Sequence, residues 1–228
     1  MRGFLRESGE GLRVIRRSAG LRRAVLAGVA VSFMSGAYLV VEPLYARHVL
    51  HRPPSQFALF EAAAGAGAVL TGLLLPRVRR QAAAALDAEG VQGSTGVRWM
   101  AAAGAGYAVA GALFTTTTIV PVAYLGAFLW GCVGATFYAF WATVIQRFSP
   151  PDATGRLFGV SGMLNSVADT VALLAAGLVV AQLGVRSGAA LLAAVPLAVC
   201  LASLRPAARW RRHDRVASAR TPPAASTQ

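Results

Sequence analysis

The sequence predicts an all-α, polytopic membrane protein with six transmembrane helices. Hydrophobic residues make up 56% of its 228 residues, charged residues only 14%, and the mean hydropathy is +0.55. A soluble globular domain carries roughly a quarter charged residues, so this composition indicates residence in a membrane. The arginines also gather at both ends of the chain and in short connections between apolar runs that are long enough to cross a bilayer.

The chain divides into three regions. Residues 1–23 interleave arginines with apolar residues, a pattern that predicts an amphipathic basic helix on the cytoplasmic membrane surface. Residues 24–204 are expected to form the six-helix transmembrane domain. Residues 205–228 are a basic tail, expected to be cytoplasmic and disordered at its polar, proline-containing end.

Six apolar runs give the expected spans, which are close to the ~20 residues that a hydrocarbon core requires. The spans are 24–45, 57–75, 100–114 with an extension to 118, 121–144, 157–183 and 188–204. Two prolines at 53–54 forbid helix continuation after the first span. The longest connection is predicted at 76–98, and Arg186 is expected in a brief turn between the last two spans.

The arginines predict the orientation. The chain has no lysine, and 19 of its 22 arginines lie in the N-terminal region, the second and fourth connections and the tail, against Arg47, Arg52 and Arg186 on the other side. By the positive-inside rule both termini are then cytoplasmic, and the plasma membrane is the expected location. No nucleic-acid-binding signature accompanies the net charge of +13, so nucleic acid is not an expected partner.

Ionisable residues inside the spans are functional candidates, because a charge in hydrocarbon is costly. Asp169 is the best of them, since twelve residues after Leu157 at 1.5 Å each place it ~18 Å along the fifth span, near the midplane. Asn165 shares its helical face. One interpretation is a proton-coupling carboxylate on a transport pathway, with Asn165 as a hydrogen-bonding neighbour. The other is a structural hydrogen bond from Asp169 to a Ser or Thr of an adjacent helix.

Two further carboxyl groups lie near the expected outer face of the membrane. Glu42 is late in the first span and Glu61 is early in the second. Both are candidates for the transport pathway. The sequence favours the alternative that they are interfacial charges, paired with Arg47 or Arg52, because water reaches a carboxylate easily at that depth.

Aromatic residues recur along one face of the fourth span: Trp130, Gly134, Phe137 or Tyr138, and Trp141. Such a stripe could line a pocket for an apolar substrate, which makes Tyr138 and Trp141 candidates for the transport pathway. Aromatic stripes in membrane helices more often make packing or lipid contacts, and Trp141 also fits an interfacial belt. Both interpretations are open.

The connection before the fifth span reads Pro-Asp-Ala-Thr-Gly-Arg-Leu-Phe-Gly over residues 151–159. It resembles the cytoplasmic connection between the tenth and eleventh helices of exporters of the major facilitator superfamily, which often read Pro-Asp/Glu, two residues, Arg-Gly-Arg, an apolar residue and Phe-Gly. Thr154 stands where the first arginine is expected. The resemblance makes Asp152, Gly155 and Arg156 candidates for a gating loop. A helix cap at Asp152 and a headgroup anchor at Arg156 are the local alternative.

Other segments extend the resemblance. Residues 10–17 before the first span, and Glu-Pro-Leu-Tyr-Ala-Arg over 42–47 at its end, are similar to the entry into the seventh helix of drug- and siderophore-type exporters. These pieces, with Asn165, cover about residues 9–183. Residues 72–80 keep only the glycine and the basic cluster of the family's Gly-x-Leu-x-Asp-Arg-x-Gly-Arg loop. The six spans match one half of such a transporter, a 3+3 helix repeat.

The resemblance implies the C-terminal half of a major facilitator transporter that exports small molecules or drugs, commonly as a proton antiporter. The expected partners are the bilayer, a small-molecule substrate and either a second copy or a separate N-terminal half. The alternative is a non-transporting accessory or regulatory membrane protein derived from such a half. Neither an enzyme nor a cofactor or metal site is expected, because no catalytic or metal-ligand motif is present and Cys132 and Cys200 lie apart in apolar runs.

Overall fold

The computed structural model describes residues 11–16, 18–53, 55–88, 95–150 and 153–204, and within residues 75–88 it describes the backbone only. All regular structure in these residues is helical, and six helices are long and apolar enough to cross a membrane. The chain is therefore an all-α, multi-pass membrane protein, and the prediction of six spans is confirmed. The predictions for residues 1–10 and 205–228 fall outside the described residues.

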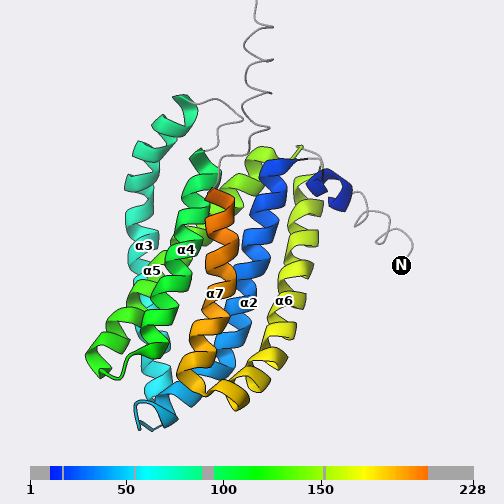
Figure 1. The fold of residues 1–228 in the computed structure, drawn as a ribbon. Helices are drawn as coiled ribbons and strands as arrows, with labels where there is room; N and C mark the ends of the chain where they lie inside the picture. Colours follow the sequence, from blue (N-terminus) through cyan, green and yellow to red (C-terminus); the bar gives the residue numbers. More distant parts are fainter. Residues whose placement is uncertain (1–10, 17, 54, 89–94, 151–152, 205–228) are drawn as a thin grey trace, which may run out of the picture.

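The helices run alternately up and down the bundle (Figure 1). They are α2 (Ala19–His48), α3 (Ser55–Ala88), α4 (Thr95–Thr116), α5 (Val120–Phe148), α6 (Thr154–Leu183) and α7 (Val185–Leu204). We call the end at which α2, α4 and α6 begin the basic end. A short helix of residues 11–16 also lies there and packs on the start of α6, where Gly11 contacts Val160.

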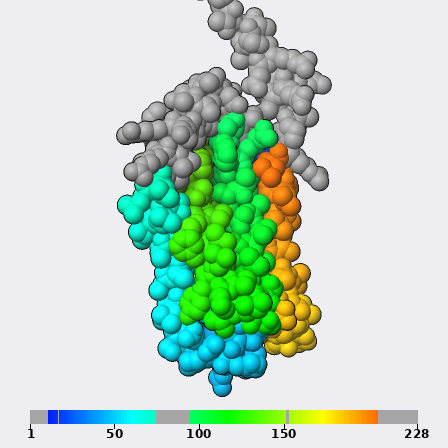
Figure 2. Space-filling model, turned by 90° about the vertical axis from the view of Figure 1, so that its left-hand side faces the viewer, coloured from blue at the N-terminus to red at the C-terminus, as the bar shows by residue number. Residues whose placement is uncertain are grey.

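The helix α2 is the centre of the arrangement. It packs most extensively against α6 and α7 and also contacts α4, whereas α3 packs mainly against α5. Viewed from the α3 side, the surface is built from α3, α4, α5 and α7, and the α2 region shows mainly at its far end (Figure 2). Of the six spans, α2 is the most buried and α6 the least.

Two predicted connections are shorter than the sequence suggested. The helix α3 continues beyond its apolar span, Ser55–Leu74, as far as Ala88, because the segment is rich in alanine, the strongest helix former. The brief turn between α6 and α7 is reduced to Gly184, whose positive φ of 76° suits glycine. Arg186 lies inside α7 rather than in the turn, and its Nε donates to the Thr116 carbonyl at 2.8 Å.

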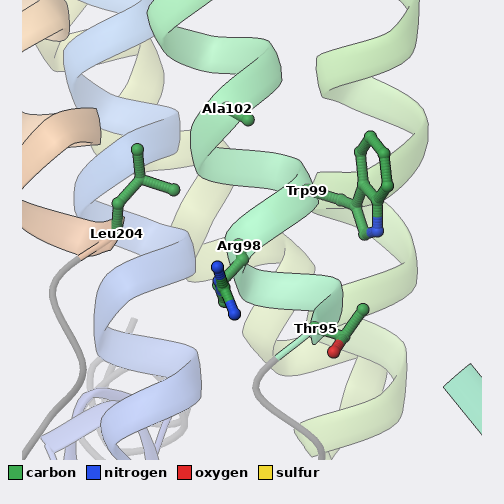
Figure 3. Close-up of a pocket in the computed structure, with 5 residues that line it drawn as sticks. All are labelled: Thr95, Arg98, Trp99, Ala102 and Leu204. Carbon is green, nitrogen blue, oxygen red and sulfur yellow. The ribbon is translucent and has the colours of Figure 1, made fainter.

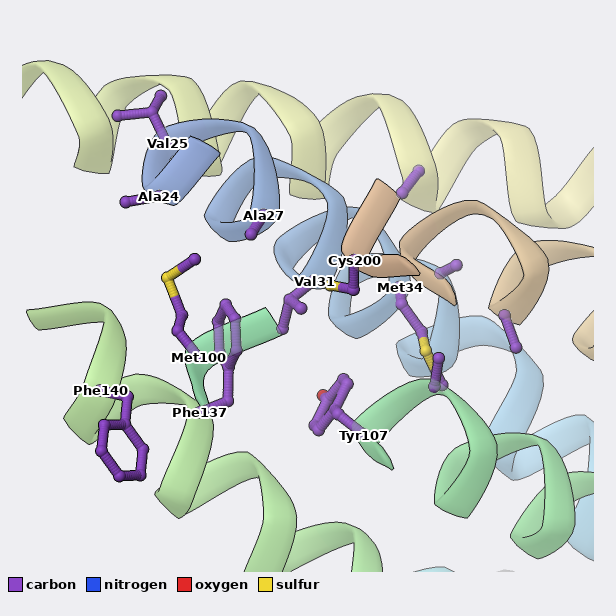
Figure 4. Close-up of a cluster of buried hydrophobic side chains, with 14 of the residues drawn as sticks. Ala24, Val25, Ala27, Val31, Met34, Met100, Tyr107, Phe137, Phe140 and Cys200 are labelled. Carbon is purple, nitrogen blue, oxygen red and sulfur yellow. The ribbon is translucent and has the colours of Figure 1, made fainter. Parts of the chain in front are cut away.

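The main core lies between α2, α4, α5, α6 and α7, and Figure 4 shows part of it. Val31 and Met34 of α2, Met100 of α4, Phe137 of α5 and Cys200 of α7 are all fully buried there. Apolar burial alone does not drive helices together in lipid, so this close side-chain packing supplies much of the attraction between them.

Small residues bring α3 and α5 into direct backbone contact. A Cβ atom on Gly67 would collide with the Phe128 carbonyl oxygen, and one on Gly131 would collide with the backbone of Ala64. The Cys132 thiol donates to the Gly67 carbonyl at 3.3 Å across the same contact. The Ala- and Gly-rich sequence of the second span predicts this kind of approach.

We predict that Gly67→Val destabilises the protein, because the added side chain forces α3 away from α5. The expected cost is about 2 kcal/mol, which for a chain of this size lowers the melting temperature by roughly 4–8 °C. The measurement is a thermal unfolding curve in detergent. Gly65→Val is the matched control, since nothing lies within 4 Å of a Cβ atom at that position. Equal losses in both variants would contradict the packing described for α3.

Candidate functional site

Glu42 is the only acidic or basic residue that is buried among the described side chains, with an exposed fraction of 2%. It lies six residues before the end of α2, or about 9 Å along the helix. The carboxyl group of Glu61 in α3 lies close enough to interact with it. Glu61 itself is exposed. Two carboxyl groups from neighbouring helices therefore meet inside the spans, and we call them the carboxyl pair.

The carboxyl pair has no other partner that would neutralise it. Glu42 Oε1 is buried without a hydrogen bond, and among the described residues no ion pair joins Glu42 or Glu61 to an arginine. The expected pairing with Arg47 or Arg52 is therefore not found. Both arginines are exposed, whereas Glu42 is buried in the bundle.

The hydroxyl groups next to Glu42 are already engaged with α4. The Thr115 hydroxyl donates its only proton to the Gly111 carbonyl at 2.8 Å. In the 3.2 Å bond between Tyr38 and Thr115, the Tyr38 hydroxyl is therefore the donor. The Tyr45 hydroxyl donates to the Thr117 carbonyl at 2.8 Å. Neither tyrosine is therefore available to donate to Glu42 Oε1.

Asp169 occupies the middle of α6, as the sequence predicts for a group near the midplane. Its backbone lies very close to α2, because a Cβ atom on Gly36 would collide with the Asp169 carbonyl oxygen. The Asp169 side chain is partly exposed, and within the described part of the chain no serine or threonine hydroxyl is bonded to it. The structure thus lacks the hydrogen bond on which the structural interpretation of Asp169 depended.

Asn165 and Trp141 meet at Gly28 of α2. A Cβ atom on Gly28 would lie 2.6 Å from Trp141 Nε1 and 3.4 Å from Asn165 Oδ1. The indole N–H of Trp141 donates to the Ala24 carbonyl at 3.1 Å, and its ring packs edge-on against Phe158 with centroids 5.7 Å apart. Trp141 of α5 therefore contacts both α2 and α6. Asn165 Oδ1 is buried without a partner.

The predicted aromatic stripe of α5 does not form one wall. Phe137 is fully buried in the core, and the Trp130 ring packs against Tyr107 with centroids 4.9 Å apart. Only Tyr138, which is 40% exposed, and Trp141 remain on the accessible side, with ring centroids 6.4 Å apart. Trp130, Phe137 and Trp141 lie within about 40° of one another around α5, so the helices packed against α5 at each level decide which of these rings is buried.

The predicted gating loop lies apart from these groups. Asp152 is outside the described residues, and α6 begins at Thr154 with Ala153, which has no side-chain acceptor, in the N-cap position. Gly155 is exposed, with open space where a Cβ atom would lie, and Arg156 is also exposed. Gly155 and Arg156 belong to the basic end.

The structure thus separates two groups of candidates. Glu42 is six residues along α2 from Gly36, which turns it about 240° around the helix axis. The carboxyl pair consequently faces α3, while Asn165, Asp169 and Trp141 belong to the junction of α2, α5 and α6. Sequence reasoning missed the glycines that build this junction. Their spacing of eight residues along α2, Gly28 to Gly36, was the available signal.

Comparisons of the chain with protein-family models, with curated proteins and with solved structures found no match. The fold and the candidate sites therefore define the class by themselves: an all-α, six-span membrane protein with paired carboxyl groups inside its spans.

We predict that dicyclohexylcarbodiimide, a reagent that partitions into bilayers, modifies Glu42. A carbodiimide adds to a protonated carboxyl group, and an unpaired carboxyl in hydrocarbon avoids the cost of charge by holding a proton. Mass spectrometry of peptides from the labelled protein locates the adduct, and Glu42→Gln should remove it. Asp169→Asn serves as the control and should leave the adduct at Glu42 unchanged. Labelling found only at Glu61 or Asp169 would contradict the burial of Glu42.

Proposed function

We propose that the chain is a membrane transporter of the major facilitator type, one half-unit that exports small molecules in exchange for protons. The observation that carries the proposal is the carboxyl pair: Glu42 is 2% exposed inside a span and lies against Glu61. A carboxyl group at that position lowers the stability of a membrane protein unless something offsets it, so its presence favours a functional role.

The pair has the chemistry of a proton-exchange site. Two carboxyl groups in contact cannot both be ionised without strong repulsion, and a shared proton relieves it. Glu61 is exposed and Glu42 is buried, so Glu61 provides an entry for protons and Glu42 holds them inside the bundle. Binding and release of one proton then changes the charge next to the contact between α2 and α3.

Asp169 is the second group that the proposal uses. It lies in the middle of α6 beside a close contact of α2 and α6, and Asn165, one turn away along α6, meets Trp141 at Gly28. We assign the half-open surface at this junction to the substrate pathway, with Tyr138 and Trp141 as its aromatic side and Asp169 as its polar group.

A major facilitator half needs a second half to close its substrate site, which the proposal assigns to another copy or to a separate N-terminal half. Support comes from α6, the least buried span, where four glycines have nothing within 4 Å of a Cβ atom: Gly155, Gly159, Gly162 and Gly177. Such a face allows a further helix to approach closely. We place the basic end in the cytoplasm and the protein in the plasma membrane, following the arginine distribution.

The test is proton-coupled flux of candidate drugs into vesicles that contain the purified chain. Glu42→Gln keeps the side-chain volume but cannot exchange a proton, and we expect it to reduce coupled flux at least tenfold while leaving the protein folded. Asp169→Asn should also reduce flux. Thr170→Ala, an exposed neighbour on α6, is the matched control and should transport normally.

A second copy would be seen as a dimer by crosslinking in mild detergent. Full flux in both carboxyl variants would overturn the proposal. It would favour the alternative of an accessory membrane protein, in which the intramembrane carboxyl groups are dispensable.

A further inference from the structure

A hollow of about 370 Å³ opens at the basic end between α4 and α7, away from both candidate sites (Figure 3). Thr95, Arg98, Trp99 and Ala102 of α4 and Leu204 of α7 line it. In Figure 3 the Arg98 side chain lies between Leu204 on one side and Trp99 on the other. The hollow therefore combines one cation, one large aromatic ring and an aliphatic wall.

Arg98 is the polar centre of this hollow. Its side chain is exposed, and no hydrogen bond or ion pair joins it to any residue in the described part of the chain. An arginine held in a lined hollow presents five N–H donors in a fixed planar fork that matches a phosphate group. The hollow is therefore complementary in charge to an anion.

The Trp99 ring forms the aromatic side of the hollow and is held in place by packing. Although 53% of its surface is exposed, its ring is stacked on Phe140 of α5, with centroids 6.3 Å apart and an angle of 15° between the planes. Tryptophan prefers the level of the lipid headgroups, where its ring contacts acyl chains and its N–H reaches polar groups. Its place in the hollow thus indicates the border between hydrocarbon and headgroups.

The spans give the same depth independently. Thr95 is the first residue of the candidate span α4 and Leu204 the last of the candidate span α7, so the hollow lies at the ends of both spans and not in their middle. Ala102, one turn deeper than Arg98, and Leu204 supply an apolar surface toward the membrane interior. A ligand that fits has a negative headgroup at Arg98 and a hydrocarbon chain along Ala102 and Leu204.

We propose that this hollow binds an anionic phospholipid, with its phosphate at Arg98 and an acyl chain against Trp99, Ala102 and Leu204. Basic hollows between transmembrane helices are suited to anionic headgroups. The bound lipid bridges α4 and α7, two helices that pack extensively, and so stabilises the folded bundle. This proposal does not depend on the transport function.

The experiment measures thermal stability of the whole chain in detergent as phosphatidylglycerol or phosphatidylcholine is added. We expect phosphatidylglycerol to raise the melting temperature more than phosphatidylcholine does, and Arg98→Gln to weaken the apparent affinity for phosphatidylglycerol about fivefold. Arg22→Gln, which removes an exposed arginine of α2 at the same end, is the matched control and should behave like the wild type. Circular dichroism without lipid checks that both variants are folded.

A second measurement locates the acyl chain. Phosphatidylglycerol with brominated acyl chains should quench the tryptophan fluorescence of the wild type, and Trp99→Phe should remove a large part of that quenching. Equal affinities of Arg98→Gln and wild type would overturn the proposal, as would equal losses in Arg98→Gln and Arg22→Gln. Equal stabilisation by inorganic phosphate alone would also overturn it, because the site would then bind a free anion rather than a lipid.

Discussion

The whole structure depends on the lack of water in the hydrocarbon core, which obliges each span to satisfy its polar groups internally. Helices do this for the backbone. Several hydroxyl side chains follow the same rule, since those of Thr115, Thr116 and Thr143 each donate to the carbonyl four residues earlier in their own helix. Four buried polar atoms of the described residues do not: Glu42 Oε1, Trp130 Nε1, Ser161 Oγ and Asn165 Oδ1. Of these, only the Glu42 carboxyl group can carry a charge, and we therefore explain it in terms of function.

Close packing at glycines places the candidate groups. Because Gly28 and Gly36 have no side chains, α6 and the Trp141 ring of α5 approach the α2 backbone directly. This fixes α2 at the centre of the bundle and sets Asp169 beside it at mid-span. The opposite side of α2 is then left to face α3 and α4, which buries Glu42 and brings it to Glu61.

The sequence was sufficient to predict the spans, because hydropathy and the prolines and arginines between the apolar runs are local signals. It misjudged residues 76–88, where charges indicated a loop although the alanines between them extend α3. It could not decide which way Glu42 faces, since that depends on the helices that flank α2. The same limit applies to Trp130, which the sequence placed with Trp141 but which packs against Tyr107. The positions of the spans are thus encoded locally, whereas the helices that a side chain contacts are set by tertiary packing.

The central claim is that Glu42 binds a proton inside the bundle. Infrared spectroscopy of the purified protein in bilayers, recorded as the pH is raised, reports this directly through the carbonyl stretch of a protonated carboxyl group. The account predicts a band that persists at neutral pH, disappears as the pH is raised further, and is missing in Glu42→Gln but present in Asp169→Asn. A spectrum of wild type with no protonated carboxyl band at neutral pH, or one unchanged by Glu42→Gln, would contradict it.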